Sequence, residues 1–534
     1  MLTPTEAKAR LSKFADKDFR QYQEEAIDFV MSSTKKFTII EAPTGSGKSL
    51  MGMVCGVMAR EANYLCSTRL LQSQITEDFP EPESVSIWGR TNYPCLYNKE
   101  VGCDVCWHTR ATPCRFVGDC TYRIAKEKAL SSKLRVLNYS YYLTEIAHAG
   151  RFANAPMTIV DEADSLEKTL VNHICLSFTE RALHRLDLPV GPRYKTVNAR
   201  GGLDSWREFA GEAKKRAGQQ VSHFDRSIDN CDKNDKESLM YYIRQRDYFN
   251  NICLRCDTLI ENVGSDWLIE EKERYGSKQA TITFRPLWVT KTLADKFLWD
   301  SCERWLLMSA AFLPANVLCK TLGIDRDEVN YMQIPSTFPA ERRPVHIWPV
   351  CSISAKTVEA EVPKLVKGIK RILSRHPNEK GIIHCVSFKL AKSIMEGVRS
   401  TRLITHDSSN KQDVVDSFIN GNGNAVILSP SLERGLSLDG DLCRFVVFAK
   451  APFLSLGDKV VSRRIYSSQV GKLWYKSEMM LAVLQGAGRG MRSADDYCVT
   501  YLVDDQINKA YTTSPSIWPE WFRDAVSWDE NELA

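Results

Sequence analysis

Segment 42–49 combines the residue types and spacing of a loop that binds nucleotide phosphates. It reads Ala-Pro-Thr-Gly-Ser-Gly-Lys-Ser, follows an apolar run at 37–40 and precedes a helical pattern. In such loops glycines let backbone N–H groups turn toward the β-phosphate, the lysine reaches the β- and γ-phosphates, and the serine hydroxyl ligates magnesium. The strict pattern begins with glycine, where this chain has Ala42. We expect the nucleotide to be bound by Thr44, Gly45, Ser46, Gly47, Lys48 and Ser49.

Acidic residues follow a second apolar run, at 157–160. An acid at the carboxyl edge of a parallel strand lies beside the phosphate loop in α/β folds. We expect Asp161 to hold magnesium, directly or through water, and Glu162 to orient and deprotonate the attacking water. Upstream, the side-chain amide of Gln23 has the donor and acceptor to read an adenine edge, although a polar helix start would have the same sequence.

Segment 485–492 places two arginines three residues apart, and such residues face the same side of a helix. Arg489 and Arg492 would supply positive charge to a γ-phosphate as arginine fingers and would stabilise charge in the transition state. Gln485 would position the water or sense the γ-phosphate. A basic helix on the surface is the alternative interpretation of this pattern.

Cysteine is the unusual feature of the composition, because five of the 17 cysteines fall between positions 95 and 120. Four thiolates suit either tetrahedral zinc or a 4Fe-4S cluster, and the spacing alone does not choose between them. Crowded thiols without a metal would invite oxidation. Cys253 and Cys256 lie in a helical pattern without a partner pair, and we interpret them as structural. The candidate metal ligands are Cys95, Cys103, Cys106, Cys114 and Cys120.

The elements that must position these residues are short apolar runs, rich in Ile and Val, separated by longer helical patterns. Such runs are typical of strands buried on both faces, and their alternation with helices predicts parallel α/β sheets. One group of runs lies before about residue 335 and another after about residue 345, with a Pro- and Arg-bearing linker at 338–344. Segments 89–125 and 170–280 interrupt the first group, and we expect them to be insertions at its loops.

The composition limits the class of protein. The 534 residues fit about two to four domains, and 43% hydrophobic with 26% charged residues exclude disorder of the whole chain. No apolar run is as long as a membrane helix, which needs about 18 residues. The N-terminus lacks the apolar region of a secretory signal peptide. The net charge of +5 neither requires nor forbids a polyanionic partner. We therefore expect a soluble, cytoplasmic protein whose cysteines are reduced or bind metal.

In their order along the chain, these motifs resemble those of superfamily 2 helicases, and more narrowly those of the XPD/DinG family of iron–sulfur DNA helicases, from about residue 18 to 505. Three residues depart from the family's usual pattern: Asp164 replaces a His, Ala311 a Thr and Arg434 a Gly. The departures bear on the coupling of hydrolysis to movement more than on hydrolysis itself. The matching segments are 42–49 (Walker A), 68–74 (motif Ia), 89–95, 120–122 and 136–139 (entry to and exit from the cluster domain), 308–311 (motif III) and Gln485, Gly488, Arg489 and Arg492 (motif VI).

The resemblance implies an α/β fold with two RecA-like parallel-sheet motor lobes. It also implies an iron–sulfur insertion and a mainly helical arch-like insertion, both in the first lobe. The expected boundaries are 1–88, 126–169 and 281–337 for the first lobe, 89–125 for the iron–sulfur cluster domain, 170–280 for the arch-like insertion and 338–534 for the second lobe.

Cofactors and partners also follow from the resemblance. They are ATP with Mg²⁺, a 4Fe-4S cluster, and single-stranded and forked DNA, handled by a monomeric motor that moves 5′ to 3′. Cys95, Cys114 and Cys120 match the family's cluster positions, and we prefer Cys106 to Cys103 as the fourth ligand. The chain is short for the family and is similar to versions carried by bacteriophages, which would act in a bacterial cytoplasm. Three tyrosines of the arch-like insertion would stack on bases or, as is commoner, belong to a core: Tyr241, Tyr242 and Tyr248.

Two other functions fit the same motifs. A nucleic-acid-binding or remodelling protein with a weakened motor would carry them, since fold does not fix function. A zinc-containing ATPase that acts on RNA would also account for the cysteines. Loss of ATP hydrolysis in the purified protein would favour the first, and colour separates the metals, because a 4Fe-4S protein is brown and a zinc protein is colourless. A P-loop kinase would leave the Gln/Arg motif unexplained.

Overall fold

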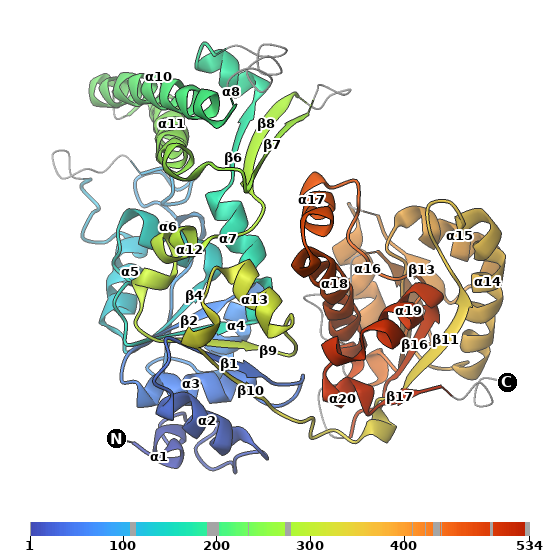
Figure 1. Cartoon of the computed structure of the whole chain (residues 1–534). Helices are drawn as coiled ribbons and strands as arrows, with labels where there is room; N and C mark the ends of the chain where they lie inside the picture. Colours follow the sequence, from blue (N-terminus) through green and yellow to red (C-terminus); the bar gives the residue numbers. More distant parts are fainter. Residues whose placement is uncertain are drawn as a thin grey trace.

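The computed structural model describes residues 2–106, 114–188, 202–232, 234–272, 279–407, 409–421, 423–430, 438, 440–491 and 495–528. Within them the chain forms two α/β lobes side by side, with a pair of long helices above the first lobe (Figure 1). The chain crosses from the first lobe to the second near the predicted linker. In this part of the chain, no helix is both long and apolar enough to cross a membrane.

The first lobe is built on a seven-stranded parallel sheet in the order β10-β1-β9-β5-β2-β4-β3. Its central strands are buried along their whole length, as their apolar sequences predict, so helices must cover both faces. The strands are β1 (Phe37–Glu41), β2 (Ala62–Cys66), β3 (Val85–Ser86), β4 (Leu134–Asn138), β5 (Met157–Asp161), β9 (Trp305–Ser309) and β10 (Val329–Gln333).

Side chains of β1 alternate between two apolar cores. Ile40 packs in the core that contains Val54 of α3, and Ile39 packs in the core that contains Tyr142 of α6. The sheet is therefore fixed between two helical layers. The helices of this lobe are α1 (Pro4–Lys8), α2 (Gln23–Ser32), α3 (Lys48–Met58), α4 (Arg69–Asp78), α5 (Thr121–Ser131), α6 (Tyr139–His148), α7 (Leu166–Ile174), α12 (Lys291–Phe297) and α13 (Ala315–Leu322).

The second lobe has its own seven-stranded parallel sheet, in the order β13-β14-β12-β15-β16-β11-β17. Two parallel sheets with helical layers confirm the predicted fold class. The strands are β11 (Val345–Cys351), β12 (Gly381–His384), β13 (Leu403–Thr405), β14 (Val426–Ser429), β15 (Phe445–Phe448), β16 (Val499–Asp504) and β17 (Val526–Ser527).

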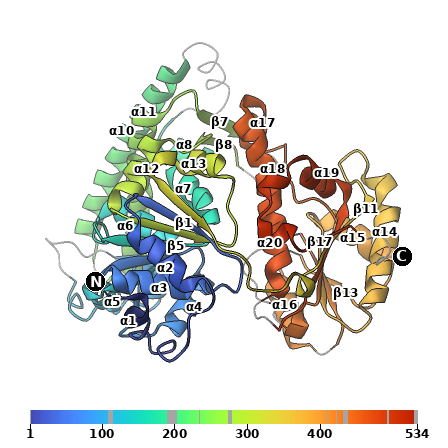
Figure 2. The same ribbon diagram turned by 60° about the horizontal axis from the view of Figure 1, so that its bottom comes forward.

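Helices α17 and α18 form the side of the second lobe that faces the first (Figures 1 and 2). The helices of the second lobe are α14 (Val358–Arg375), α15 (Phe388–Val398), α16 (Lys411–Asn420), α17 (Lys459–Ser467), α18 (Gln469–Ala487), α19 (Asp505–Thr513) and α20 (Glu520–Arg523).

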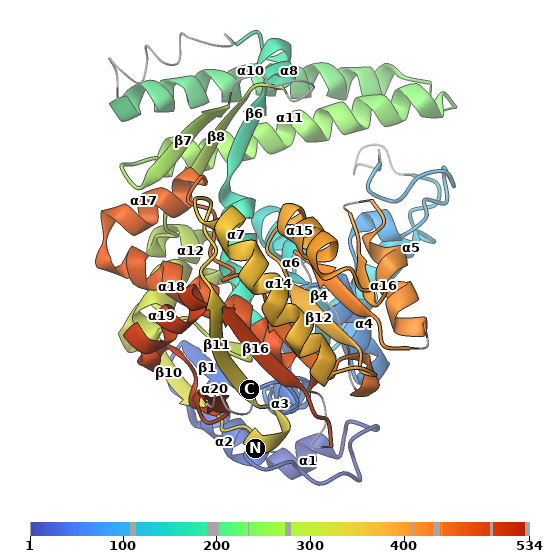
Figure 3. The ribbon, with the colours of Figure 1, turned by 90° about the vertical axis from the view of Figure 1, so that its right-hand side faces the viewer.

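The arch-like insertion consists of two long helices over a small sheet. Helices α10 (Gly202–Asn230) and α11 (Lys236–Asn262) lie alongside each other across the first lobe (Figure 3). A short helix, α8 (Glu180–Arg185), and a three-stranded antiparallel sheet in the order β6-β8-β7 join them to the lobe. The sequence predicts the helices but not this sheet. Its strands are β6 (Leu176–Thr179), β7 (Trp267–Lys272) and β8 (Thr281–Pro286).

The cysteine-bearing segment has little regular structure of its own within its described residues. A 3-10 turn at Arg90–Asn92 precedes an irregular stretch up to Cys106. Val105 packs in a small apolar cluster with Ile228 of α10 and Leu239 of α11. The segment therefore makes apolar contacts with the ends of the two long helices.

Candidate functional site

The phosphate loop leaves the end of β1 and enters α3 at Lys48, so the amino end of a helix points at the expected phosphate position. Gly45 and Gly47 both have a φ of +82°, a left-handed backbone that glycine adopts without strain. A Cβ on Gly47 would also collide with Nε2 of Gln23. The two glycines therefore stand where the turn and its packing require them.

Gln23, at the start of α2, is hydrogen-bonded to the phosphate loop. Its Nε2 donates a hydrogen bond to the Ser46 carbonyl at 2.8 Å, and its Oε1 accepts one from the Arg20 N–H at 2.9 Å. The Arg20 guanidinium donates to the Gly45 carbonyl. Both ends of the Gln23 amide are therefore engaged within the protein, and its contact with adenine stays a prediction.

Lys48 and Asp161 form the charged centre of the site. Lys48 Nζ donates to the Ala42 carbonyl at 2.9 Å, and Asp161, at the end of β5, accepts from the Tyr64 hydroxyl at 2.7 Å. Burial raises the pKa of the Asp161 carboxyl to about 6, against the opposing effect of the Lys48 charge. The Tyr64 hydroxyl also interacts with Ser49. The two residues predicted to hold magnesium therefore meet at one tyrosine, which the sequence did not reveal.

Glu162 turns away from the core at the end of β5. Its φ of +56° is left-handed, a conformation that a non-glycine residue adopts at the cost of strain. Its N–H donates to Asp161 Oδ1 at 3.0 Å, and its exposed carboxylate accepts from the Ser67 hydroxyl at 2.6 Å. Ser67, just after β2, thus orients the predicted general base.

Asp164 joins three parts of the molecule. Its carboxylate accepts hydrogen bonds from the Ser309 hydroxyl at 2.7 Å and from Gln485 Nε2 at 2.5 Å. Ser309 ends β9 in the first lobe, whereas Gln485 lies on α18 in the second. The residue that departs from the family's usual histidine is therefore a direct link between the lobes. Ala311, the second departure, is buried and follows Ser309 by two positions in the chain.

The glycine–arginine turn that follows α18 faces the phosphate loop. A Cβ on Gly488 would lie 3.2 Å from Thr44 Oγ1, so the backbone of the second lobe closely approaches the loop. Arg489 lies in this turn and is 9% exposed. Arg492 lies outside the described residues, as does Arg434. The predicted arginine-bearing turn and the phosphate loop are therefore brought together in this structure.

A second contact between the lobes is centred on Arg464 of α17, which is 4% exposed. Its Nε donates to the Leu287 carbonyl at 2.5 Å, and its guanidinium pairs with the Glu167 carboxylate at 2.6 Å. The guanidinium also lies 4.2 Å from the ring centroid of Trp288 and 4.5 Å from that of Trp474. Burial raises the pKa of Glu167, and the Arg464 charge opposes this shift. We call these five residues the Arg464 latch.

The cysteines are only partly assembled in the described residues. Cys103 Sγ lies 3.9 Å from Cys120 Sγ. Burial, together with the nearby Cys120 and Cys95 thiols, raises the pKa of Cys103 to about 11. Among the described residues, which leave out 107–113, no three His, Cys, Asp or Glu side chains are grouped to hold a metal. Cys103, the least favoured ligand from the sequence, is therefore in contact with Cys120.

The second cysteine pair and the three tyrosines of the arch-like insertion all lie on α11. Cys256 is fully buried in α11, as a structural residue should be. Tyr241 is 53% and Tyr248 40% exposed, so both are accessible to a ligand. Tyr242 instead packs against the apolar cluster at the ends of the helices.

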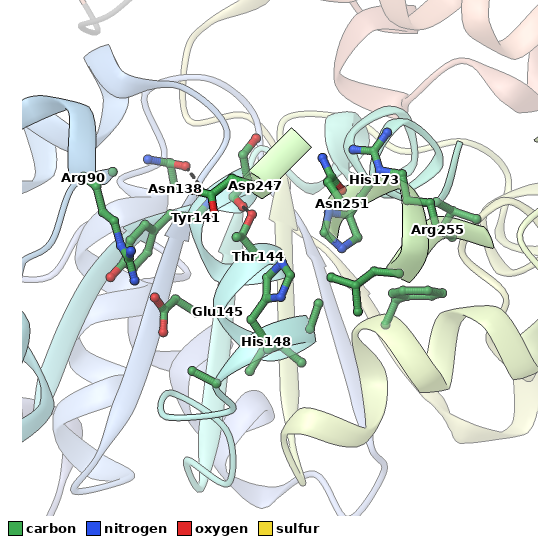
Figure 4. A pocket seen from close by; sticks show the side chains of 18 of the residues that line it. Arg90, Asn138, Tyr141, Thr144, Glu145, His148, His173, Asp247, Asn251 and Arg255 are labelled. Atoms are coloured by element: carbon green, nitrogen blue, oxygen red, sulfur yellow. Dashed lines mark hydrogen bonds between the residues drawn. The ribbon is translucent and has the colours of Figure 1, made fainter. Parts of the chain in front are cut away.

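A cavity of about 1100 Å³ lies where the first lobe, the cysteine-bearing segment and α11 meet. Figure 4 shows Arg90, Tyr141 and Glu145 on one side of it and His173 and Arg255 on the other. Basic, acidic and aromatic side chains are interleaved over this lining. Such a surface suits the charged backbone and the bases of a nucleic acid strand better than it suits an apolar small molecule.

A phosphate loop and an acidic strand end on one parallel sheet face a Gln/Arg turn on a second sheet, which is the arrangement expected of a helicase-type nucleotide site between two lobes. Residues 20–182 match the DEAD/DEAH box helicase family, and residues 369–524 match the helicase C-terminal domain family. Each lobe therefore matches a helicase family domain, in line with the resemblance that the sequence motifs show.

Two curated relatives share limited identity with the chain. "ATP-dependent DNA helicase YoaA" of Escherichia coli is 22% identical over 247 residues, which cover 43% of this chain and 37% of that protein. "ATP-dependent DNA helicase CHL1" of Saccharomyces cerevisiae is 25% identical over 159 residues, covering 26% of this chain and 18% of that protein. The chain thus spans well under half the length of these two relatives.

Solved structures share the fold over nearly the whole chain. A structure titled "XPD_Helicase" superposes with a TM-score of 0.59 at 15% identity and covers 95% of this chain and 98% of its own. The Xpd4 structure of S. tokodaii has a TM-score of 0.56 at 12% identity and covers 96% of this chain and 100% of its own. At these identities the likeness establishes the fold.

Proposed function

We propose that this chain is an ATP-dependent DNA helicase that moves 5′ to 3′ on single-stranded DNA and separates duplexes. The observation that carries the proposal is the contact between Asp164 and Gln485, which links the acidic motif of one lobe to the Gln/Arg motif of the other. Because the nucleotide site is divided between the lobes, nucleotide binding and release would change their relative position. The relatives' names as DNA helicases support DNA as the track.

The proposed roles follow from the contacts at the site. Lys48 and the amino end of α3 bind the phosphates, Asp161 and Ser49 hold magnesium, and Glu162 deprotonates the attacking water. Neutral pH lies above the pKa of Asp161, which is about 6, so its side chain is ionised and is available as a carboxylate ligand. The groups proposed to sense the γ-phosphate and stabilise its charge are Gln485, Arg489 and Arg492.

We propose that the cavity bounded by α11 and the cysteine-bearing segment takes the single strand. Arg90 and Arg255 would contact phosphates from opposite sides of the cavity. The apolar contact of Val105 with Ile228 would enclose the strand on the outside. A strand held in this way would not dissociate during repeated cycles of the lobes.

The test is strand displacement by anaerobically purified protein on duplexes that carry either a 5′ or a 3′ single-stranded tail. Unwinding from the 5′ tail alone, dependent on ATP, is the expected result. Matched RNA tails distinguish the RNA-acting alternative. If neither tail supports unwinding while DNA binding is intact, the helicase proposal fails and the binding or remodelling alternative stands.

Asp164→Ala is expected to lower DNA-stimulated ATP turnover roughly tenfold, equivalent to about 1.4 kcal/mol of transition-state stabilisation. The change removes the acceptor for both Ser309 and Gln485, so the lobes lose a direct link beside the nucleotide. Asp164→Asn keeps one carbonyl oxygen and should retain most of the activity. The measurement is a steady-state ATPase assay of the parent and the two variants. If Asp164→Ala hydrolyses ATP as fast as the parent, this link between the lobes is not needed for turnover.

We propose that four of the five clustered cysteines hold a 4Fe-4S cluster, which would staple a segment that lacks a core of its own. The thiol chemistry and the contact between Cys103 and Cys120 support a metal site here. Zinc is the second candidate, because a tetrahedral site with bonds of about 2.3 Å spaces its sulfurs about 3.8 Å apart. The observed separation of 3.9 Å is close to that value.

Protein purified without oxygen should be brown and contain about four irons per chain. Cys120→Ser should lose the iron and the colour, whereas Cys253→Ser, a cysteine of α11 outside the cluster, should keep both. Iron and zinc analysis of the three proteins is the measurement. One zinc per colourless chain would establish the second candidate, and a chain with neither metal would contradict both.

A further inference from the structure

His384 is a buried polar side chain that the proposed reaction does not yet use. It ends β12, an inner strand of the second sheet, and is 1% exposed. Its ring stacks on Phe448 with centroids 4.8 Å apart. In the described part of the chain, neither ring nitrogen has a hydrogen-bond partner. Buried polar atoms are nearly always paired in folded proteins, so two unpaired nitrogens at a strand end point to a function.

The Gln/Arg turn lies directly against this imidazole. Gly486, near the end of α18, approaches so closely that a Cβ there would lie 2.9 Å from His384 Nε2. Arg489 follows three residues later, and burial together with the Arg489 charge lowers the pKa of His384 to about 3. At neutral pH the imidazole is therefore uncharged and keeps one nitrogen as an acceptor.

We propose that His384 is a positioning residue for Arg489, whose guanidinium donates to His384 Nε2 when a nucleoside triphosphate occupies the site between the lobes. The proposal rests on the proposed ATPase function. A carboxylate in this place would also orient the guanidinium, but it would neutralise the charge that the γ-phosphate requires. A neutral imidazole orients the arginine and leaves its full charge for the transition state.

Three substitutions separate this role from core packing. His384→Phe keeps an aromatic ring on Phe448 without nitrogens, His384→Gln places an amide near the position of Nε2, and His384→Asn places one near Nδ1. We expect kcat for ATP to fall roughly tenfold in the Phe and Asn variants, with KM changed less than about twofold, and the Gln variant to recover most of the loss. The Tm of His384→Phe should equal or exceed that of the parent, because two unpaired buried nitrogens are removed.

A double-mutant cycle tests whether the effect passes through the arginine. If His384 acts by positioning Arg489, adding His384→Phe to Arg489→Ala should cause little further loss of kcat. The proposal is overturned if His384→Phe turns over ATP as fast as the parent, or if its loss adds fully to that of Arg489→Ala.

A binding measurement keeps this test separate from the proposed function. The parent and Lys48→Ala proteins are assayed first, and a parent that hydrolyses no ATP ends the helicase proposal. The affinities for ADP–beryllium fluoride and for ADP are then compared, since only the former presents a γ-phosphate mimic. The parent and His384→Gln should prefer the mimic and His384→Phe should lose that preference. Equal preference in the parent and His384→Phe, or none in the parent, would overturn the role of His384.

Discussion

Lys48→Ala is expected to lower ATP turnover at least about a hundredfold, equivalent to about 2.7 kcal/mol. Lys48 Nζ lies in the curve of the phosphate loop, 2.9 Å from the Ala42 carbonyl, where it would meet the β- and γ-phosphates. Its charge also counteracts the rise in the pKa of Asp161. The substitution therefore removes a phosphate ligand and disfavours the ionised form of the residue proposed to hold magnesium.

The matched control is Lys35→Ala, an exposed lysine just before β1 that lies outside the site. It removes the same charge from the chain, so it should leave turnover unchanged. The measurement is phosphate release at saturating ATP with single-stranded DNA. Comparable turnover by Lys48→Ala and the parent protein would exclude this loop as the nucleotide site.

Arg464→Ala is expected to destabilise the folded chain by about 3–5 kcal/mol, because it leaves the Glu167 carboxylate, whose side chain is only 14% exposed, without its partner. The same change removes the guanidinium from between Trp288 and Trp474. Arg464→Lys should restore little, since an ammonium does not reproduce the planar stack or the second hydrogen bond to Leu287. Thermal melting and limited proteolysis between the lobes measure the effect.

Arg464→Met combined with Glu167→Gln is the control for this prediction. It removes both charges, so it should be less destabilised than Arg464→Ala alone. The comparison separates the loss of the ion pair from an unpaired buried charge. A single variant as stable as the parent would show that the latch does not hold the lobes together.

The motor lobes could be predicted because their strands are buried on both faces, and such strands appear in the sequence as continuous apolar runs. The runs at 37–40, 157–160 and 445–448 all became strands. The sheet of the arch-like insertion was missed because β6 has four residues and alternates buried with exposed positions, a weak signal. Two-residue strands such as β3 carry no periodicity at all.

Site residues with fixed spacing were found, whereas those defined by distant contacts were not. Tyr64 and Ser67 lie on and just after β2, a neighbour of β5, so the convergence of parallel strand ends was a signal for them. Glu167 and Arg464 are 297 positions apart, and neither belongs to a spaced motif. Asp164 was visible as a departure, but its two hydrogen bonds depend on how the lobes meet.

The order of strands in the first sheet determines when β1 can pair with its neighbours while the chain is being synthesised. β1 pairs on one side with β9 (Trp305–Ser309) and on the other with β10 (Val329–Gln333). A ribosome therefore releases the phosphate loop and both insertions before either neighbour of β1 exists. During that interval the apolar strand has unpaired N–H and C=O groups and is open to misassembly or chaperone capture. The insertions must fold beside an unfinished sheet, so the nucleotide site is among the last parts of this lobe to form as the chain emerges.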